Sequence, residues 1–253
     1  MATTTTIFVD SRLRTATAGG SDSNFEVDLR ESIHISSASR LRVDSVTFTD
    51  SFLTTDSGTH LYFRDAGEGI NVFSVPVGAY TGASLASAIQ TATGRNTFYN
   101  SFTNSITHDL AAADQPWLSD AELANHTGGG FPSGASRSDP RSLNAVLGDG
   151  AIVGGQVIWG FVRMSPFNYV FLRSTRLRCV DHHGPAGSHD ILAIIPLSQG
   201  TGSQVESSSP DGVFYRMKGN FSLQSFDLSL TDFKGTPVDL RGRPLALQIT
   251  VLD

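Results

Sequence analysis

Apolar residues recur at every second position along stretches of this chain, and this alternation limits most strongly how it can fold. Residues 25–29 alternate apolar with acidic side chains, and residues 245–251 alternate almost to the end. Successive side chains of a strand point to opposite faces, so each run predicts a half-buried strand. Shorter runs of the same type occur at residues 62–63, 72–77, 157–162 and 169–172. About eight short strands separated by turn residues predict an all-β fold, an antiparallel β-sandwich with a single jelly roll.

Two strands change phase in the middle. Leu41 and Val43 share one face, whereas Val46 and Phe48 continue one residue out of step. Because a one-residue slip would turn the second half outward, the pattern predicts a β-bulge near Asp44. A second bulge is predicted near Gln224, where the alternation of residues 221–230 is broken in the same way.

The middle of the chain has a different character. Residues from about 95 to 155 are rich in Gly, Ser, Asn and Asp, which predicts a polar, partly helical insertion in the jelly-roll domain. Helix signals are a Thr81 cap with a Gly94 stop, a Ser119 cap three residues before Glu122, and an Asp139 cap before Pro140 with a stop at Gly148. The jelly-roll domain is expected over residues 24–253.

Residues 1–23 are expected to form an N-terminal arm, because small and polar residues dominate them. The exception is Ile7, Phe8 and Val9, which could add a strand to a neighbour or to the same subunit. Deleting residues 1–10 is then expected to leave folding intact and to weaken incorporation into particles.

The last strand is expected to lie inside its sheet and to pair with the strand of residues 25–29. Its apolar face carries Leu245, Leu247, Ile249 and Val251. An Ile249→Asp substitution is expected to be harmful, and Thr250→Asp to be mild because Thr250 points outward.

Charge and composition exclude several classes of protein. The formal net charge is −6, and Asp, Glu, Lys and Arg make up only 17% of residues. This balance argues against a dedicated nucleic-acid binder, which needs a basic footprint. The densest basic cluster, Arg173, Arg176 and Arg178, is interpreted as a solvated or interface strand. There is no apolar run of membrane-spanning length, no signal-peptide pattern, and a lone Cys179, so we expect synthesis in a reducing compartment.

One segment, CVDHHGPAGSHD, collects residues that can bind metals. A zinc or iron site needs three or four such groups at one point. Adjacent histidines of an extended segment point to opposite faces, and the following Gly-Pro-Ala-Gly is typical of an exposed turn. A polar surface loop is therefore preferred to a metal site. The residues concerned are Cys179, Asp181, His182, His183, His189 and Asp190.

The chain has neither a Gly-x-Ser-x-Gly elbow nor a phosphate-binding loop motif. We expect no catalytic, cofactor-binding or metal-binding residues, and no enzymatic activity. Trp117, Trp159 and the phenylalanines are interpreted as core or interface residues rather than a carbohydrate platform.

Several stretches, in order, resemble one group of proteins. They are IFVDSRLRTATAGGSDSNFEVDLRESIHISSASRLRVDSVTFTDSF, VPVGAYTGASLASAIQTAT, LSDAEL with DPRSLNAVLG, DILAIIPLSQGTGSQVESSSPDGVFYRMKG, and FDLSLTDFKGTPVDLRGRPLALQITVLD. Together they are similar to penton and minor capsid proteins of the double-jelly-roll DNA-virus lineage, including virophages, polinton-like viruses and large DNA viruses.

The resemblance implies a structural virion protein, a penton subunit that forms a pentamer at an icosahedral five-fold vertex. It implies neighbouring major and minor capsid proteins as partners, with a vertex spike or a host receptor as further candidates, and no specific nucleic acid. Assembly would take place in the host cytoplasm or nucleus. The alternatives are another minor capsid or spike-associated jelly roll, and a lectin-like module that binds glycans or a receptor.

Overall fold

The structure is a computed structural model, and it divides into two compact units. It describes residues 3–15, 20–64, 69–111, 115–116, 119–181, 184, 188–198, 200–209 and 212–253. The first unit comprises residues 1–51 and 167–253, and the second unit comprises residues 52–166. Among the described residues, no helix is long and apolar enough to cross a membrane.

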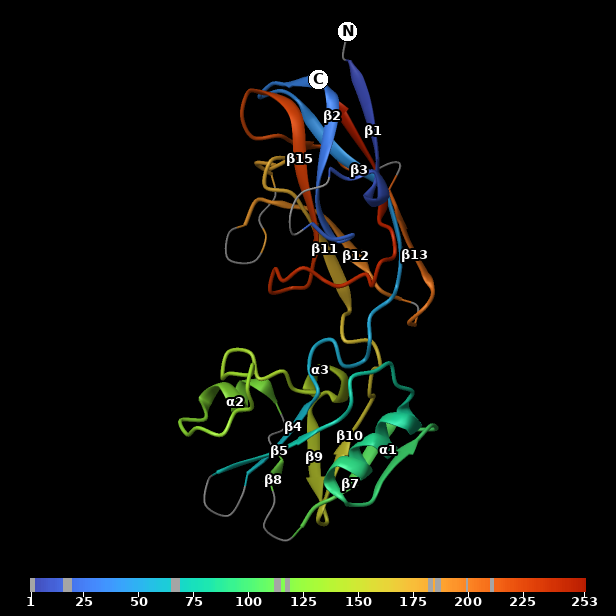
Figure 1. The fold of residues 1–253 in the computed structure, drawn as a ribbon, viewed down its shortest axis with the longest axis vertical. Coiled ribbons are helices and arrows are strands. Elements are labelled where there is room, and N and C mark those ends of the chain that lie inside the picture. The colour runs from blue at the N-terminus through green and yellow to red at the C-terminus, as the bar shows by residue number, and fades with distance from the viewer. Residues whose placement is uncertain are drawn as a thin grey trace. The chain divides into compact units, whose positions relative to one another are not determined.

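Two antiparallel sheets make up the first unit (Figure 1). The β1 sheet has the order β1-β16-β3-β13, and β14 also pairs with β3. Its strands are β1 (Thr4–Asp10), β16 (Ala246–Leu252), β3 (Arg40–Thr49), β13 (Gln204–Ser208) and β14 (Tyr215–Arg216). The β2 sheet has the order β12-β11-β15-β2. Its strands are β12 (Ile191–Pro196), β11 (Tyr169–Arg173), β15 (Phe221–Thr231) and β2 (Asn24–Ile35).

The strand order is that of a jelly roll. With β14 set aside, the eight strands numbered along the chain have the orders 1-8-3-6 and 2-7-4-5, so the two sheets exchange strands as two interlocked Greek keys. Buried apolar residues alternate along both sheets, for example Val46 and Phe48 on β3 and Phe226 and Leu228 on β15. The predicted all-β sandwich is confirmed.

The last strand lies inside its sheet, as predicted, but its partners differ from the expected one. β16 pairs with β1 on one side and β3 on the other. The strand of residues 25–29 belongs to β2, which pairs with β15 in the other sheet. Apolar alternation defines the buried face of a strand and leaves its partner open, which is why this pairing was wrong.

Both predicted phase changes coincide with ladder irregularities. On β3, Ser45 lies opposite Gln248 and Val43 opposite Ile249, so Asp44 is the extra, bulged residue. Near Gln224, Leu223 lies opposite Ile33 and Ser225 opposite Asp28. Between these two pairs, β2 has more extra residues than β15. The predicted irregularity is confirmed, but most of its extra residues lie on β2 rather than on the strand that contains Gln224.

The second unit has two small antiparallel sheets and its own core. One sheet has the order β6-β7-β10-β9 and the other β5-β4-β8. Their strands are β6 (Thr97–Asn100), β7 (Ser105–Asp109), β10 (Gln156–Trp159), β9 (Gly150–Val153), β5 (Ile70–Ser74), β4 (His60–Arg64) and β8 (Gln115–Pro116). Buried Phe63, Leu85, Ile106 and Trp159 belong to one apolar cluster.

The described residues of the second unit form three helices: α1 (Gly82–Thr93), α2 (Asp120–Asn125) and α3 (Asn144–Leu147). α1 and α2 begin as predicted, because Thr81 and Ser119 accept hydrogen bonds from the backbone amides of Ser84 and Glu122. α1 also ends as predicted, at Gly94, which has a positive φ. The third differs: α3 begins after Leu143, whereas Asp139 closes a turn with Ser136. Its predicted end at Gly148 is confirmed.

The domain boundaries differ from those expected. Residues 4–10 form β1, which pairs with β16 of the same chain over seven residues, and Ile7 and Val9 are buried. This matches the alternative in which residues 7–9 add a strand to their own subunit; residues 16–19 of the expected arm lie outside the described part. The second unit contains the expected insertion of residues 95–155 and starts much earlier, because β4 and β5 also belong to it.

Candidate functional site

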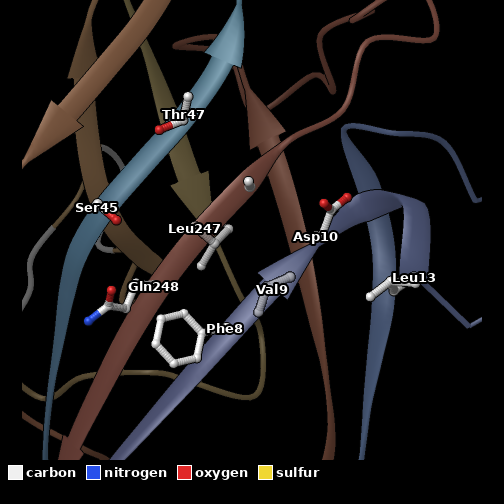
Figure 2. Close-up of a pocket in the computed structure, with 9 residues that line it drawn as sticks. Phe8, Val9, Asp10, Leu13, Ser45, Thr47, Leu247 and Gln248 are labelled. Carbon is white, nitrogen blue, oxygen red and sulfur yellow. The ribbon is translucent and has the colours of Figure 1, made fainter.

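A shallow groove crosses the outer face of the β1 sheet. Its volume is about 350 Å³, and Phe8, Leu13, Thr47 and Gln248 are among the residues that line it (Figure 2). Phe8 is 77% exposed and Leu13 is 87% exposed. Large apolar side chains with this exposure, placed together at a sheet edge, are typical of surfaces that other molecules cover.

The register of the sheet places the groove residues in rows. Phe8 lies opposite Gln248, and Gln248 lies opposite Ser45. Facing residues of neighbouring strands share a face of the sheet, so this row runs from the apolar edge strand to a polar interior. In the next row Asp10 lies opposite Ala246, which lies opposite Thr47. The groove therefore has an aromatic wall and a small, polar floor.

The bulged residue Asp44 organises the polar side of this face. Its carboxylate accepts hydrogen bonds from Arg42 Nε at 2.6 Å, Gln248 Nε2 at 3.2 Å and Thr250 Oγ1 at 2.5 Å. The side chain of Asp44 is only 9% exposed. A bulge can re-aim one side chain without moving the rest of the strand. Asp44 thus fixes three neighbouring side chains in place.

The hydrogen bond between Thr250 and Asp44 changes the effect expected for the Thr250→Asp substitution. The side chain points outward, as predicted, but Thr250 is only 5% exposed and is bonded to Asp44. An Asp at this position would place a second carboxylate against the first, so Thr250→Asp is expected to be harmful rather than mild.

A second apolar patch lies on the β2 sheet at its β12 edge. Ile194 is 59% exposed and Tyr169 is 41% exposed. The Tyr169 ring contacts Phe171 edge-on with centroids 5.3 Å apart, and Ile194 lies opposite Phe171 in the ladder. Arg173 covers the same Phe171 ring, with its guanidinium 5.3 Å from the centroid.

The two apolar patches lie on opposite flanks of the jelly roll. β1 and β2 lie side by side, since a groove is lined by Thr5, Ile7 and Phe8 together with Val27 and Leu29. β12 and β13 are the strands at the other ends of the same two sheets. The flank with Phe8 and the flank with Ile194 therefore differ in residues and in position.

The metal-binding candidates do not converge in the part of the chain that the structure describes. Asp190 forms an ion pair with Arg173 at 3.1 Å, and Asp181 forms one with Arg216 at 3.1 Å. His189 contributes a backbone carbonyl that accepts a hydrogen bond from the Cys179 amide. His182 and His183 lie outside the described residues. That the chain binds no metal and catalyses no reaction stays a prediction.

Cys179 is fully buried, and its thiol lies near the Leu177 carbonyl, 3.7 Å away. Burial, together with the nearby Asp181, raises the pKa of the thiol to about 12. A thiol of this kind is neutral at ordinary pH, whereas nucleophilic attack and metal binding use the thiolate.

Trp159 is buried in the core of the second unit, as expected, and Trp117 lies outside the described residues. Sequence reasoning missed the role of Asp44 and the exposure of Phe8. A signal for Phe8 exists: Ile7, Phe8 and Val9 are three apolar residues in succession, and in a strand one of them must face away from the other two.

The strand order and the described surface define a class: the first unit is a single jelly roll, the architecture of viral capsid domains and also of lectins and cupins. No protein-family model matches the chain, and no curated protein matches it. Among solved structures, the chain is similar to the mavirus penton protein, with a TM-score of 0.48, 10% sequence identity and 99% of each chain covered.

Proposed function

We propose that this protein is a structural virion protein, a capsid subunit that forms a closed ring of five at an icosahedral vertex. The observation that carries the proposal is the pair of different apolar patches, Phe8 with Leu13 and Ile194 with Tyr169, on opposite flanks of one jelly roll. Each patch is a surface that the isolated chain leaves exposed and a second copy would cover.

The two patches favour a ring over a two-fold dimer. A two-fold interface uses the same patch on both subunits, whereas a contact between different patches leads from one subunit to the next and forms a ring when the rotation between subunits closes. The number five comes from the resemblance to penton proteins described above. In this arrangement the Phe8 flank of one subunit contacts the Ile194 flank of the next.

The same proposal includes a location in the virion and contacts with neighbouring major and minor capsid proteins. It includes no catalytic activity. The alternatives are another minor or spike-associated capsid position, which would keep the jelly roll without five-fold symmetry, and a lectin-like module. A monomer that binds glycans would indicate the lectin-like module.

Native mass spectrometry of the full chain tests the ring. We expect a pentamer, and we expect Phe8→Asp to weaken it, because a buried interface aromatic contributes about 2 kcal/mol or more. That energy corresponds to roughly a 30-fold weaker association. Phe102→Asp is the matched control, since Phe102 is 96% exposed and lies in the second unit.

The outcomes separate the parts of the proposal. A pentamer that Phe8→Asp leaves intact would show that another surface makes the contact. A chain that stays monomeric at every concentration would contradict the ring. A reconstruction of particles with density for this chain only at six-fold or edge positions would exclude the vertex assignment and retain the jelly roll.

A further inference from the structure

Three chain segments far apart in the sequence lie side by side at one end of the first unit. Cys179 and Met217 form an antiparallel bridge, flanked by hydrogen bonds from the Lys218 amide to the Arg178 carbonyl and from the Val180 amide to the Arg216 carbonyl. On the other side, Arg216 of β14 lies opposite Arg40 of β3. This is the end of the unit where β3 begins and both chain termini lie (Figure 1).

The alternation of these segments brings four cations to one face. Cys179, Met217 and Leu41 point inward and are at most 2% exposed. Their chain neighbours point outward and are exposed, except Arg42, which is half-buried and forms an ion pair with Asp44. Residues that face each other across antiparallel segments share a side, so the outward face carries one cationic group from each position. These residues, named here the cation face, are Arg40, Arg178, Arg216 and Lys218.

The cation face is poorly neutralised by the protein itself. Asp181 forms an ion pair with Arg216. In the part of the chain that the structure describes, Arg40, Arg178 and Lys218 have no ion pair. Asp253, whose carboxylate accepts hydrogen bonds from Ser36 and Ser39, adds a negative charge near this end but forms no ion pair with these cations in the described part of the chain.

Like charges directly opposite each other destabilise a sheet. Two such pairs occur here, Arg40 with Arg216 and Arg178 with Lys218. In a chain with a net charge of −6, this concentration of positive charge is a local feature that an external anion would stabilise.

We infer that the cation face binds the phosphate backbone of nucleic acid, without reading its sequence. Three of the four cations are arginines, whose planar guanidinium groups bind phosphate through two parallel hydrogen bonds. Contact with the nucleic-acid backbone requires only positive charges, whereas recognition of a base sequence would require side chains that reach base edges.

An acidic protein surface is the other candidate anion, and the residues around the cation face favour nucleic acid over it. Protein interfaces rely on central aromatic or large apolar anchors. The exposed large apolar residues in and next to the described parts of these segments are Val180, which is 39% exposed, and Val213, which is 68% exposed, and neither is aromatic. The apolar anchors of the first unit lie elsewhere, at Phe8 and Ile194. The inference goes beyond the proposed capsid role and does not depend on it, because binding is measured on the isolated chain.

Fluorescence anisotropy of the full-length protein with a labelled random DNA duplex of about 25 base pairs, at several salt concentrations, provides the test. Each phosphate contact contributes about −0.9 to the slope of log affinity against log salt, so four contacts predict a slope of about −3.6. The double variant Arg178→Gln with Lys218→Gln should make the slope shallower, at about −1.8, and weaken binding at about 50 mM salt at least tenfold.

The matched control is Arg30→Gln with Arg243→Gln, which removes two charges from exposed residues elsewhere in the first unit. It should change the affinity by less than about twofold and leave the slope unchanged. A melting curve confirms folding of each variant, and removing the like-charged pair of Arg178 and Lys218 should keep or raise the melting temperature. Arg40→Gln provides a second test of the same face.

Three results would overturn the inference. The wild-type chain could show no salt-dependent binding, or the control could lose as much affinity as the test variant. The test variant could also lose self-association in the absence of DNA, which would assign the cation face to an acidic surface of another copy.

Discussion

At the scale of single residues, Asp44 combines a backbone role with a polar one. It is the extra residue of a bulge, and its carboxylate binds Arg42, Gln248 and Thr250 from two strands. Asp44→Ala should lower the free energy of unfolding by about 2 to 3 kcal/mol, because nearly buried donors lose their acceptor. Urea denaturation measures this. Asp239→Ala is the control: the Asp239 side chain is 70% exposed, and its loss should cost less than about 0.5 kcal/mol.

A loss of stability as small as that of the control would show that the three donors find other acceptors. In that case the bulge would be maintained by the backbone alone, including the hydrogen bond from the Ser209 amide to the Asp44 carbonyl.

Cys179 gives a prediction about pH. Its pKa is raised to about 12, above the ordinary thiol value, because burial disfavours the thiolate. The neutral thiol is thus favoured by folding; this contribution is complete below the ordinary pKa and is lost as pH rises towards 12. In the native protein at pH about 8, a thiol reagent should leave the cysteine unmodified, and in denaturant it should modify one thiol per chain. Rapid modification of the native protein would contradict this burial.

At the scale of elements, β1 is expected to be an integral strand. Ile7 points into the core at 6% exposure, and its neighbour Phe8 points out at 77% exposure. Ile7→Asp should therefore lower the free energy of unfolding by about 3 kcal/mol or more, because it buries a charge. Phe8→Asp should leave stability within about 0.5 kcal/mol. Thermal or urea unfolding of both variants distinguishes a strand from an arm, for which the two substitutions would have equal, small effects.

The same pairing changes the outcome expected for the deletion of residues 1–10. That deletion removes the edge strand that covers β16, so an unpaired, apolar strand edge would be left exposed. We expect an aggregation-prone chain, in place of a folded chain with weakened assembly. Soluble yield and size-exclusion chromatography measure the result.

Local features of the elements were predictable from sequence, and long-range ones were not. The phase slip at Asp44 and the caps at Thr81 and Ser119 are signals between neighbouring residues. By contrast, β4 and β5 are short β-type runs like those of the sandwich, so nothing local assigns them to the second unit. The cation face joins residues 40, 178, 216 and 218, and the visible signal was only the arginine density at residues 173–178.

At the scale of the whole molecule, the proposed functions belong to the first unit. Phe8, Leu13, Tyr169 and Ile194, which are proposed to form the ring contact, and the whole cation face lie within residues 1–51 and 167–253. In a ring of five, the cation face would occur five times on related surfaces, so a phosphate polymer would meet repeated sites. Repetition of weak sites on one assembly increases their combined affinity.

The second unit has its own core, and we expect it to fold independently. Its main core includes, among the described residues, thirteen buried side chains from Leu61 to Val162, all within residues 52–166. The chain enters and leaves it through the connection between β3 and β11, so a deletion of residues 52–166 removes one continuous segment. Residues 52–166 expressed alone should therefore show a cooperative melting transition. Residues 1–51 joined to 167–253 by a short Gly-Ser linker should fold as well.

The shortened chain also tests where the ring contact lies. Because both proposed patches remain, it should still form a pentamer in native mass spectrometry, and Phe8→Asp should weaken that pentamer as it does in the full chain. A folded but monomeric shortened chain would show that residues 52–166 contribute to the contact. An unfolded shortened chain, beside a folded second unit, would show that the jelly roll depends on the inserted segment for stability, and the two units would then form one cooperative structure.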